Sequence, residues 1–379
     1  MILKAPGIEY FKLRQRKMKK FLIIIIVILS STLILSGCGE DSTTATTVQS
    51  TEATTEATEV FTIKYASMDA ETSWSAQHST IPWAEEVERV TDGRVQVEVY
   101  WSNTLCAAMD IWESVKSGVA DAGDMAMPFW PGLAPLSDVI SLPFLGVETA
   151  EQGSAAFWDL YEQYPSIRDE FQDIHFMFEA VSAPAVLITT GKQVKTVEDM
   201  AGMKIRVTGG PATDFVESVG ASAMLVPMVD VYTNLQKGVI DGVLASWTSV
   251  QSMSFYEVAE YVTNVPVYST YCVRGMNLDF WNSLPSDIQE ALNGINGFDR
   301  SVLYGKTQFD EHTDVVKIEL KELGYEMIEY TPTASEMADW QEAAMPIWQQ
   351  WIDDMEEAGH PEATEILDTA LELLETYRP

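Results

Sequence analysis

Basic residues are scarce in this sequence. Its 379 residues include 23 Lys and Arg against 57 Asp and Glu, and seven of the basic residues precede Cys38. The part after Cys38 therefore has a formal charge of about −40, from 16 basic and 56 acidic residues. A surface this acidic repels nucleic acid and anionic headgroups, so we exclude both as partners. It also makes any cation in a binding site conspicuous.

Motifs for metal binding and catalysis are missing as well. The four histidines lie far apart in the sequence, without HxxH or HExxH spacing, and there is no GxSxG. Besides Cys38 there are two cysteines, Cys106 and Cys272, which could form one disulfide or stay as separate buried thiols. We therefore predict no metal, no cofactor and no enzymatic activity. A secreted hydrolase stays an alternative, which turnover of a substrate by the purified protein would support.

The N-terminus has the pattern of a lipoprotein signal. A basic segment precedes the apolar run from Phe21 to Leu35, which is short for a membrane-spanning helix, and Ser36-Gly37-Cys38 follows. Small residues before a thiol permit cleavage there and lipid attachment to the sulfur. We predict a signal peptide over 1–37 with lipidation at Cys38; the alternative is an ordinary signal peptide with a chance cysteine. Met18-Lys-Lys is a second candidate start of translation.

Residues 38–60 predict a flexible, lipid-anchored linker. The segment is rich in Thr, Glu and Ala and has no aromatic residue before Phe61, so it cannot bury enough surface to fold. About 320 residues remain, which suits two lobes better than one compact core.

The remaining sequence alternates between strand and helix patterns. Residues 61–66 and 94–100 alternate like strands, and residues 81–91 between them have helical spacing. Similar alternation follows Glu170, and the last third is helical over 286–322, 335–357 and 362–377. This order predicts an α/β fold with mainly parallel sheets and a helical C-terminal part.

Four blocks of sequence resemble the solute-binding proteins of tripartite ATP-independent periplasmic (TRAP) transporters, the DctP family. The first is WAEEVERVTDGRV (83–95) with a following Leu105, and the second is VKSGVAD (115–121) with LPFL (142–145). The third is TVEDMAGMKIRV (196–207), continued by GASAMLVPM (220–228) and NLQKGVIDG (234–242). The fourth is MNLDFWNSLP (276–285). Together they lie within residues 61–330. The resemblance implies a two-lobed periplasmic-binding-protein-like fold with a ligand cleft between the lobes. It places lobe I at 61–183 plus 272–311 and lobe II at 184–271 plus 312–379.

Arg206 is the predicted anion-binding residue. It stands where the family's motif has a substrate-binding arginine, and a planar guanidinium can hold a carboxylate through two hydrogen bonds. Gly209-Gly210-Pro211 opens the next predicted helix, whose N-terminal amides favour negative charge. The alternative is a surface arginine paired with a nearby acid.

Five further residues complete the predicted ligand site. Ser246 and Trp247 follow Asp241-Gly242, where relatives carry contact residues, and Trp247 could stack on an unsaturated or aromatic acid. Trp74, Trp130 and Asn277 are weaker candidates; the alternative is packing for each tryptophan and a helix cap for Asn277. No arginine stands near Pro184, where some sugar-acid-binding relatives have a second one.

The prediction is therefore a TRAP-type solute-binding lipoprotein outside the cell. It captures a small organic anion, for which we favour a monocarboxylate with an apolar or aromatic body. Its other partners are the integral membrane permease subunits and, through the lipid anchor, the cell membrane. The alternative is a binding lipoprotein of an ABC importer or of a sensor system.

Overall fold

The computed structural model describes residues 59–379. The predicted signal peptide, Cys38 and nearly all of the predicted linker lie outside these residues. No helix in the described part is both long and apolar enough to cross a membrane.

The first sheet is built from the N-terminal strands and two later ones. Its order is β2-β1-β3-β10-β4, and β10 runs antiparallel to both its neighbours while β1, β2 and β3 are parallel. Its strands are β1 (Phe61–Ala66), β2 (Val95–Tyr100), β3 (Ala122–Ala126), β4 (His175–Val181) and β10 (Tyr271–Met276). The two strands expected at 61–66 and 94–100 are thus confirmed.

The second sheet has six strands in the order β11-β9-β5-β8-β6-β7. β6, β7 and β8 are parallel, whereas β5 runs antiparallel to β8 and β9. Its strands are β5 (Ala185–Thr189), β6 (Lys204–Val207), β7 (Ser222–Leu225), β8 (Gly242–Ala245), β9 (Tyr261–Tyr268) and β11 (Ile328–Tyr330). We call each sheet with its covering helices a lobe, lobe I for the first sheet and lobe II for the second.

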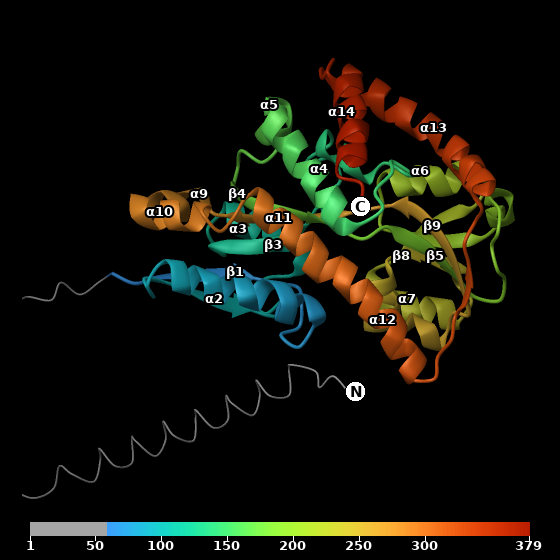
Figure 1. The fold of residues 1–379 in the computed structure, drawn as a ribbon, viewed down its shortest axis with the longest axis horizontal. Coiled ribbons are helices and arrows are strands. Elements are labelled where there is room, and N and C mark those ends of the chain that lie inside the picture. The colour runs from blue at the N-terminus through green and yellow to red at the C-terminus, as the bar shows by residue number, and fades with distance from the viewer. Residues whose placement is uncertain (1–58) are drawn as a thin grey trace, which may run out of the picture. The chain divides into compact units, whose positions relative to one another are not determined.

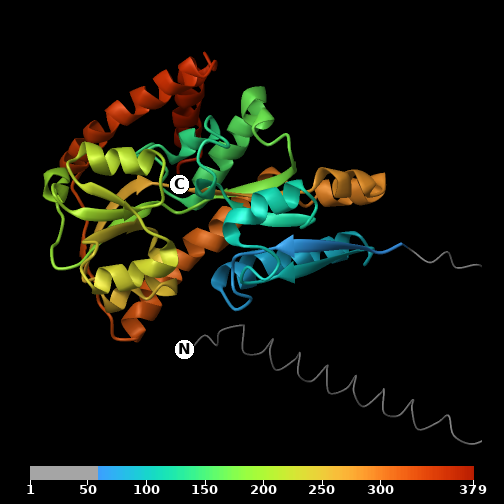
Figure 2. The ribbon, with the colours of Figure 1, turned by 180° about the vertical axis from the view of Figure 1, so that it is seen from behind.

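Helices cover both sheets (Figures 1 and 2). They are α2 (Ile81–Val90), α3 (Ile111–Lys116), α4 (Ala150–Gln163), α5 (Pro165–Asp169), α6 (Pro211–Ser218), α7 (Met228–Gln236), α8 (Trp247–Ser252), α9 (Leu278–Ser283), α10 (Ser286–Asn293), α11 (Phe298–Gly305), α12 (Glu311–Glu322), α13 (Ala334–Glu357) and α14 (Ala363–Thr376). The predicted helical C-terminal part is confirmed, as is the two-lobed α/β fold class.

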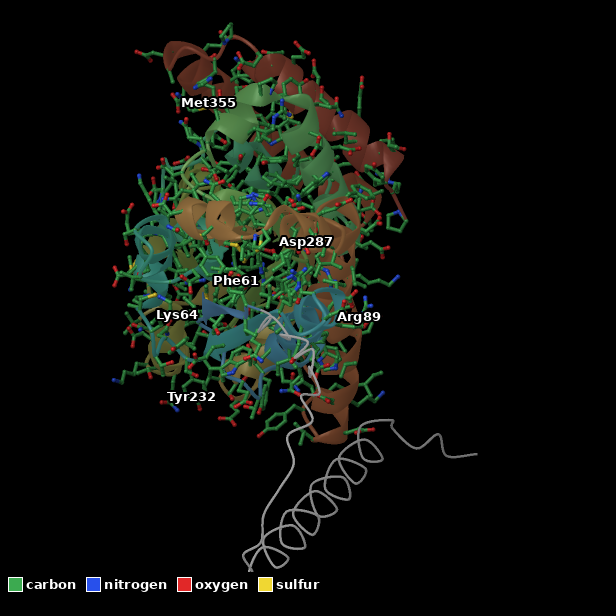
Figure 3. The ribbon with its side chains drawn as sticks, turned by 90° about the vertical axis from the view of Figure 1, so that its left-hand side faces the viewer. Phe61, Lys64, Arg89, Tyr232, Asp287 and Met355 are labelled. Carbon is green, nitrogen blue, oxygen red and sulfur yellow. The ribbon has the colours of Figure 1, made fainter. Side chains whose placement is uncertain are left out.

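Hydrogen bonds and an ion pair fix the N-terminal strands of lobe I. Figure 3 labels Phe61 and Lys64 on β1, with Asp287 in the first turn of α10. The Lys64 amide donates to the Asp121 carboxylate at 2.9 Å, and its ammonium donates to the Val119 carbonyl at 3.1 Å. Asp287 pairs with Arg94, just before β2. These contacts join segments distant in sequence at the amino ends of β2 and β3.

Each face of the second sheet packs against different helices. Ile205 and Val207 on β6 lie in one core with Phe215 of α6 and Trp340 of α13. Val243 on β8 lies in the other core, with residues of α7. Side chains alternate across a strand, so Arg206, between Ile205 and Val207, points to the α7 face.

The C-terminal helices pack on both lobes, whereas the family resemblance implies that residues 312–379 belong to lobe II. α13 begins in the core of lobe II at Trp340, but Trp351 near its end packs in the core of lobe I. Leu367 and Leu374 of α14 are also part of that core. An amphipathic pattern shows which face of a helix is buried but not which lobe covers it, because both lobes offer apolar surface.

Besides α13, three segments described here cross between the lobes. Ser182–Pro184 joins β4 to β5, and Ser269–Thr270 joins β9 to β10. The two strand crossings contact each other, since the Ser182 amide donates to the Thr270 carbonyl at 2.7 Å and the Thr270 amide donates to the Ser182 hydroxyl at 3.0 Å. The third crossing is a π-helical turn, Lys306–Asp310, between α11 and α12, which run on from each other in Figure 1.

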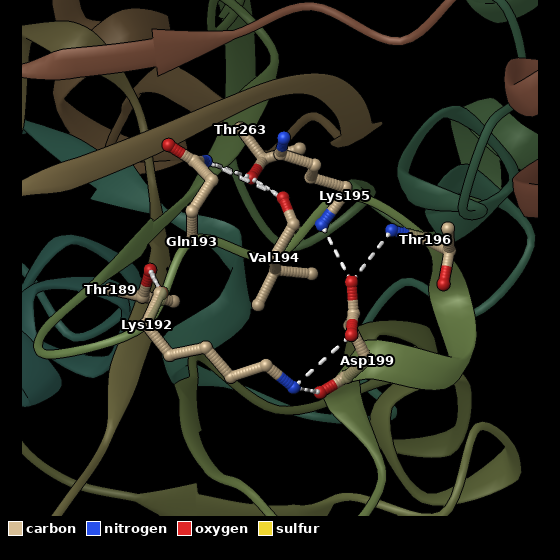
Figure 4. A network of polar contacts seen from close by, with 8 residues as sticks. All are labelled: Thr189, Lys192, Gln193, Val194, Lys195, Thr196, Asp199 and Thr263. Carbon is tan, nitrogen blue, oxygen red and sulfur yellow. Dashed lines mark hydrogen bonds and ion pairs between the residues drawn. The ribbon is translucent and has the colours of Figure 1, made fainter.

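A polar network fixes the loop that leads into β6 (Figure 4). The Asp199 carboxylate accepts hydrogen bonds from the Lys195 and Thr196 amides at 3.0 and 3.2 Å and pairs with the Lys192 ammonium at 3.2 Å. These bonds, the Lys195 amide first, lower the pKa of Asp199. Gln193 reaches Thr263 on β9 at 3.1 Å. The TVEDMAG block therefore serves to hold the entry to the strand that carries Arg206.

Candidate functional site: an unpaired arginine beside an interlobe cavity

One parallel strand of each lobe ends at a shared cavity. In open α/β sheets, ligands bind outside the carboxyl ends of the strands. Met127 comes directly after β3 in lobe I, and Thr208 comes directly after β6 in lobe II. Both line a cavity of about 110 Å³, together with Asp138 and Ser141 from lobe I and Tyr268 at the end of β9. The cavity is thus bounded by both lobes.

Arg206 is buried and held in one orientation. Its side chain is 5% exposed, and Nε donates to the Val226 carbonyl at 3.0 Å, just after the end of β7. This bond leaves the two terminal nitrogens of the guanidinium to other partners.

No acidic residue of the described part pairs with Arg206. Nη1 is buried and has no hydrogen-bond partner there, and the side chain forms no salt bridge with any of those residues. Burial lowers the pKa of Arg206, and the Tyr268 hydroxyl opposes this shift. Buried charges in proteins are normally paired, because desolvating an isolated ion costs several kcal/mol. An unpaired buried guanidinium therefore has the properties of an anion-binding group.

Tyr268 lines the interlobe cavity and lies in the electrostatic field of Arg206. Its hydroxyl hydrogen-bonds with the Thr208 hydroxyl at 3.2 Å, and both residues line the cavity. Burial raises the pKa of Tyr268, whereas Thr208 and the Arg206 charge lower it. The phenol stays neutral and can donate or accept a hydrogen bond at neutral pH.

Two other predicted residues lie at carboxyl ends of strands. Ser246 follows β8, the strand paired with β6, and its hydroxyl contacts the Thr248 hydroxyl at 2.7 Å. Trp130 comes soon after β3, and its indole donates to the Met109 carbonyl at 3.0 Å while its ring packs on the lobe I core. Both lie at ends of the parallel strands, on opposite lobes.

The remaining three predicted residues have their polar atoms committed elsewhere. Asn277 caps α9, accepting from Phe280 at 2.9 Å and donating to Val115 at 2.8 Å, and Met276 before it pairs with the amino end of β3. Trp74 donates to the Thr307 carbonyl at 2.8 Å and stacks between two imidazoles.

Trp247 is packed against α12. Its indole donates to Asn264 at 3.3 Å, and the Lys317 ammonium lies 4.3 Å from its ring centre. Trp247 also lines a second cavity, together with Thr149 of lobe I. The part that Trp247, Trp74 and Asn277 take in ligand binding therefore stays a prediction, and the site proposed below is built on the other residues.

Exposed apolar side chains also lie at the carboxyl ends of strands, and the sequence patterns did not single them out. Met109 comes before α3, Phe129 follows β3, and Leu225 ends β7; they are 66%, 39% and 70% exposed. On so acidic a surface, exposed large apolar groups indicate contact with an apolar partner. Asp138, Thr208 and Tyr268 were also not foreseen, since their positions depend on which loops meet.

Metal and disulfide chemistry find no support in the described part. No group of three or more His, Cys, Asp or Glu side chains in residues 59–379 is arranged to hold a metal ion. Cys106 and Cys272 are separate thiols. The site as built can bind an anion through fixed charge and hydrogen bonds.

Two α/β lobes with a cavity at their strand ends and a buried cation beside it define a two-lobed binding protein. The chain belongs to family 7 of the bacterial extracellular solute-binding proteins, the DctP family, whose pattern it matches over residues 67–354.

Solved structures agree with this assignment. The chain is similar to a TRAP solute-binding protein from Rhodoferax ferrireducens in complex with copurified benzoate, with 25% identity and a TM-score of 0.77 over 84% of this chain and 98% of that one. It is also similar to a TRAP protein from Bordetella bronchiseptica with bound mandelate, with 26% identity and a TM-score of 0.74 over 83% and 99% of the two chains. Among curated relatives, the ectoine/5-hydroxyectoine-binding protein of Ruegeria pomeroyi is 25% identical over 73% of this chain and 80% of its own length.

Proposed function

We propose that this protein captures a small organic acid outside the cell and delivers it to the membrane subunits of a TRAP transporter. The observation that carries the proposal is the buried guanidinium of Arg206, which has no acidic partner in residues 59–379. A ligand carboxylate would supply the missing negative charge and accept the free N–H groups. Fixed by Val226, the guanidinium presents them without reorganisation.

The ligand class follows from the surroundings of Arg206. Relatives solved with benzoate and with mandelate show that this fold accepts aromatic monocarboxylates. Here the apolar side chains of Phe129 and Leu225 stand at strand ends on opposite lobes. No second arginine stands near Pro184 to hold another acidic group. We therefore propose a monocarboxylate with an apolar or aromatic body.

Capture would work by closure of the lobes rather than by chemistry. A ligand that contacts both lobes stabilises the closed arrangement over the open one. The crossings at Ser182 and Thr270 are the segments about which such a motion would occur, and the π-helical turn before α12 is the third. No step of bond making or breaking is part of the proposed function.

Delivery requires the protein to stay near the membrane. The lipobox at Cys38 and the linker to residue 60 would anchor it there, on the outer face of the cell membrane. If Cys38 carries lipid, the wild-type protein will fractionate with membranes and Cys38→Ser will appear in the soluble fraction. Equal partition of the two would contradict the anchor and leave the binding function unaffected. The alternative partner is an ABC importer or a sensor, and a neighbouring gene for an ATPase would favour the importer.

A thermal-shift series tests the anion site. Wild type, Arg206→Ala and Lys204→Ala are titrated with benzoate, mandelate, a 2-oxo acid and a neutral aromatic amide. Lys204 is the matched control, an exposed cation two residues away on the same strand. We expect acids to raise the melting temperature of wild type and Lys204→Ala, while Arg206→Ala does not respond. Equal stabilisation of Arg206→Ala by an acid would refute the site.

A further inference from the structure

The lobe I wall of the interlobe cavity carries an acid that the carboxylate-binding function does not use. Asp138 and Ser141 belong to one 3₁₀ turn, Ser137–Ser141, and are three residues apart, so their side chains lie on the same face of that turn. Both line the cavity, opposite Thr208 and the glycines that precede α6 in lobe II. The lobe I wall of the cavity, which faces the lobe that carries Arg206, therefore presents hydrogen-bond acceptors.

The Asp138 carboxylate has free accepting capacity. Oδ1 accepts from the Tyr271 hydroxyl at 3.2 Å, and within residues 59–379 the carboxylate takes part in no other side-chain hydrogen bond and in no salt bridge. An ionised carboxylate has about four lone-pair sites, so most of its capacity is unused. Ser141 adds a buried hydroxyl oxygen that has no partner in the same part of the chain.

Neighbouring groups do not neutralise Asp138. The neighbouring acid Glu170 brings no positive charge, and its carboxylate accepts hydrogen bonds from the Leu136 and Ser137 amides at 2.7 and 3.0 Å. None of the described residues that line the cavity is a Lys or an Arg. Burial raises the pKa of Asp138 to about 6, while the Tyr271 hydrogen bond opposes the shift. The cavity is therefore poor for a second anionic group and suited to a hydrogen-bond donor.

We propose that Asp138, assisted by Ser141, receives a hydrogen-bond-donating group on the bound acid, a hydroxyl or an ammonium, and so makes the protein selective for acids that carry one. The inference rests on the proposed function, because Arg206 in lobe II holds the carboxylate of the same ligand. Each end of the ligand is then held by a different lobe. A site that accepts a hydrogen bond rejects an analogue without the donor, since the buried acceptor is left unpaired.

The test compares ring substituents with and without a hydrogen-bond donor at the same ring position. The probes are benzoates carrying methyl, hydroxyl or aminomethyl groups, each as the meta and the para isomer, measured by calorimetry with the full mature protein. In wild type we expect the hydroxyl or the aminomethyl compound of at least one isomer series to bind about tenfold more tightly than its methyl partner. The compound that binds more tightly than its methyl partner shows whether the preferred donor is a hydroxyl or an ammonium.

Substitutions in the lobe I wall test whether Asp138 and Ser141 cause the preference for donor-bearing benzoates. Asp138→Asn keeps the shape and the capacity to accept from Tyr271, and Asp138→Leu removes the acceptor. We expect Asn to reduce the preference, most strongly for aminomethyl, and Leu to abolish it while the methyl compounds still bind. Ser141→Ala should weaken the preference about threefold. Asp279→Asn, an exposed acid in the first turn of α9, should behave as wild type. Circular dichroism and the melting temperature without ligand check that each variant is folded.

The outcomes separate this inference from the proposed function. If benzoates bind through Arg206 but methyl and donor-bearing compounds bind equally, the inference is wrong and the proposed function stands. The inference is also wrong if the preference survives in Asp138→Leu. If no benzoate binds, or if Arg206→Ala binds as well as wild type, the ligand arrangement on which both rest is refuted.

Discussion

The Nε of Arg206 donates to the carbonyl oxygen of Val226 at 3.0 Å. This bond adds to the pairing of β6 with β7 and fixes the guanidinium plane. It explains how an arginine can stay buried at 5% exposure with Nη1 unpaired in the described part of the chain. Burying this charge without a counter-ion in residues 59–379 costs desolvation free energy.

Replacing Arg206 by an apolar residue should stabilise the protein without ligand. Because the buried charge has no counter-ion in residues 59–379, Arg206→Met removes a desolvation cost while keeping most of the side-chain volume. We expect the free energy of unfolding to rise by about 1 kcal/mol in urea titrations, with loss of the response to acids. Lys204→Met, on the same strand but exposed, should change stability by less than about 0.5 kcal/mol. A large loss of stability in Arg206→Met would mean that the guanidinium is paired in solution.

The exposed apolar residues at the strand ends should contribute to binding but not to folding. Phe129→Ser and Leu225→Ser should lower affinity for an aromatic acid about tenfold each and make the heat-capacity change of binding less negative. Their melting temperatures without ligand should stay near that of wild type, since both side chains are exposed. Leu323→Ser, an exposed leucine at the end of α12, is the control and should affect neither quantity. Unchanged affinity in both test variants would contradict an apolar ligand body.

The buried pair of Arg274 and Asp124 should dominate the stability of lobe I. Arg274 Nη2 lies 3.2 Å from Asp124 Oδ1, with both side chains almost fully buried, and its guanidinium carbon is 4.3 Å from the Tyr304 ring centre. Arg274→Met leaves the Asp124 charge unpaired, so we expect a loss of about 3–5 kcal/mol in unfolding free energy. The double variant with Asp124→Leu should recover part of this loss. Additive effects of the two single substitutions in a double-mutant cycle would contradict direct coupling.

The stacked His312 should make the protein less stable in mild acid. Its ring lies parallel to Trp74, 4.7 Å between centres, and burial together with the nearby His78 lowers the pKa of His312 to about 4. Below pH 6.5 the unfolded chain therefore takes up a proton that the folded state does not, and stability falls as the pH approaches 4. His312→Phe keeps the stack but not the titration.

Melting curves at pH 7, 6 and 5 test whether the protein loses stability as the pH falls. Relative to wild type, His312→Phe should gain about 1–2 °C in melting temperature between pH 7 and pH 5. At pH 7 the variant can be slightly less stable, because it lacks the 3.2 Å contact of His312 with Gln251. A difference between the two proteins that stays constant with pH would show that His312 is not held neutral by the fold.

Local sequence patterns located much of the fold. Alternation gave β1 and β2 to within a residue, and helical spacing gave the C-terminal helices. The patterns were silent on α4, because eight of its 14 residues are buried, including Gly153, Ser154 and Ala155, so no polar face stands out. They could not decide between ligand contact and packing for Trp247 and Asn277, since a tryptophan or asparagine after a strand looks alike whether it meets a ligand or a neighbouring helix.

The sequence by itself determined the class of fold, the acidic surface and the arginine that belongs on β6, because each depends on local periodicity, composition or a contiguous motif. Only the tertiary structure decided that Arg206 has no acidic partner in the described residues, that Thr208 and Tyr268 meet at a cavity, and that Asp138 faces that cavity from the other lobe. The physical reason is that burial and pairing are set by segments far apart in the chain. Asp138 and Thr208 are 70 positions apart and come together only where two lobes meet.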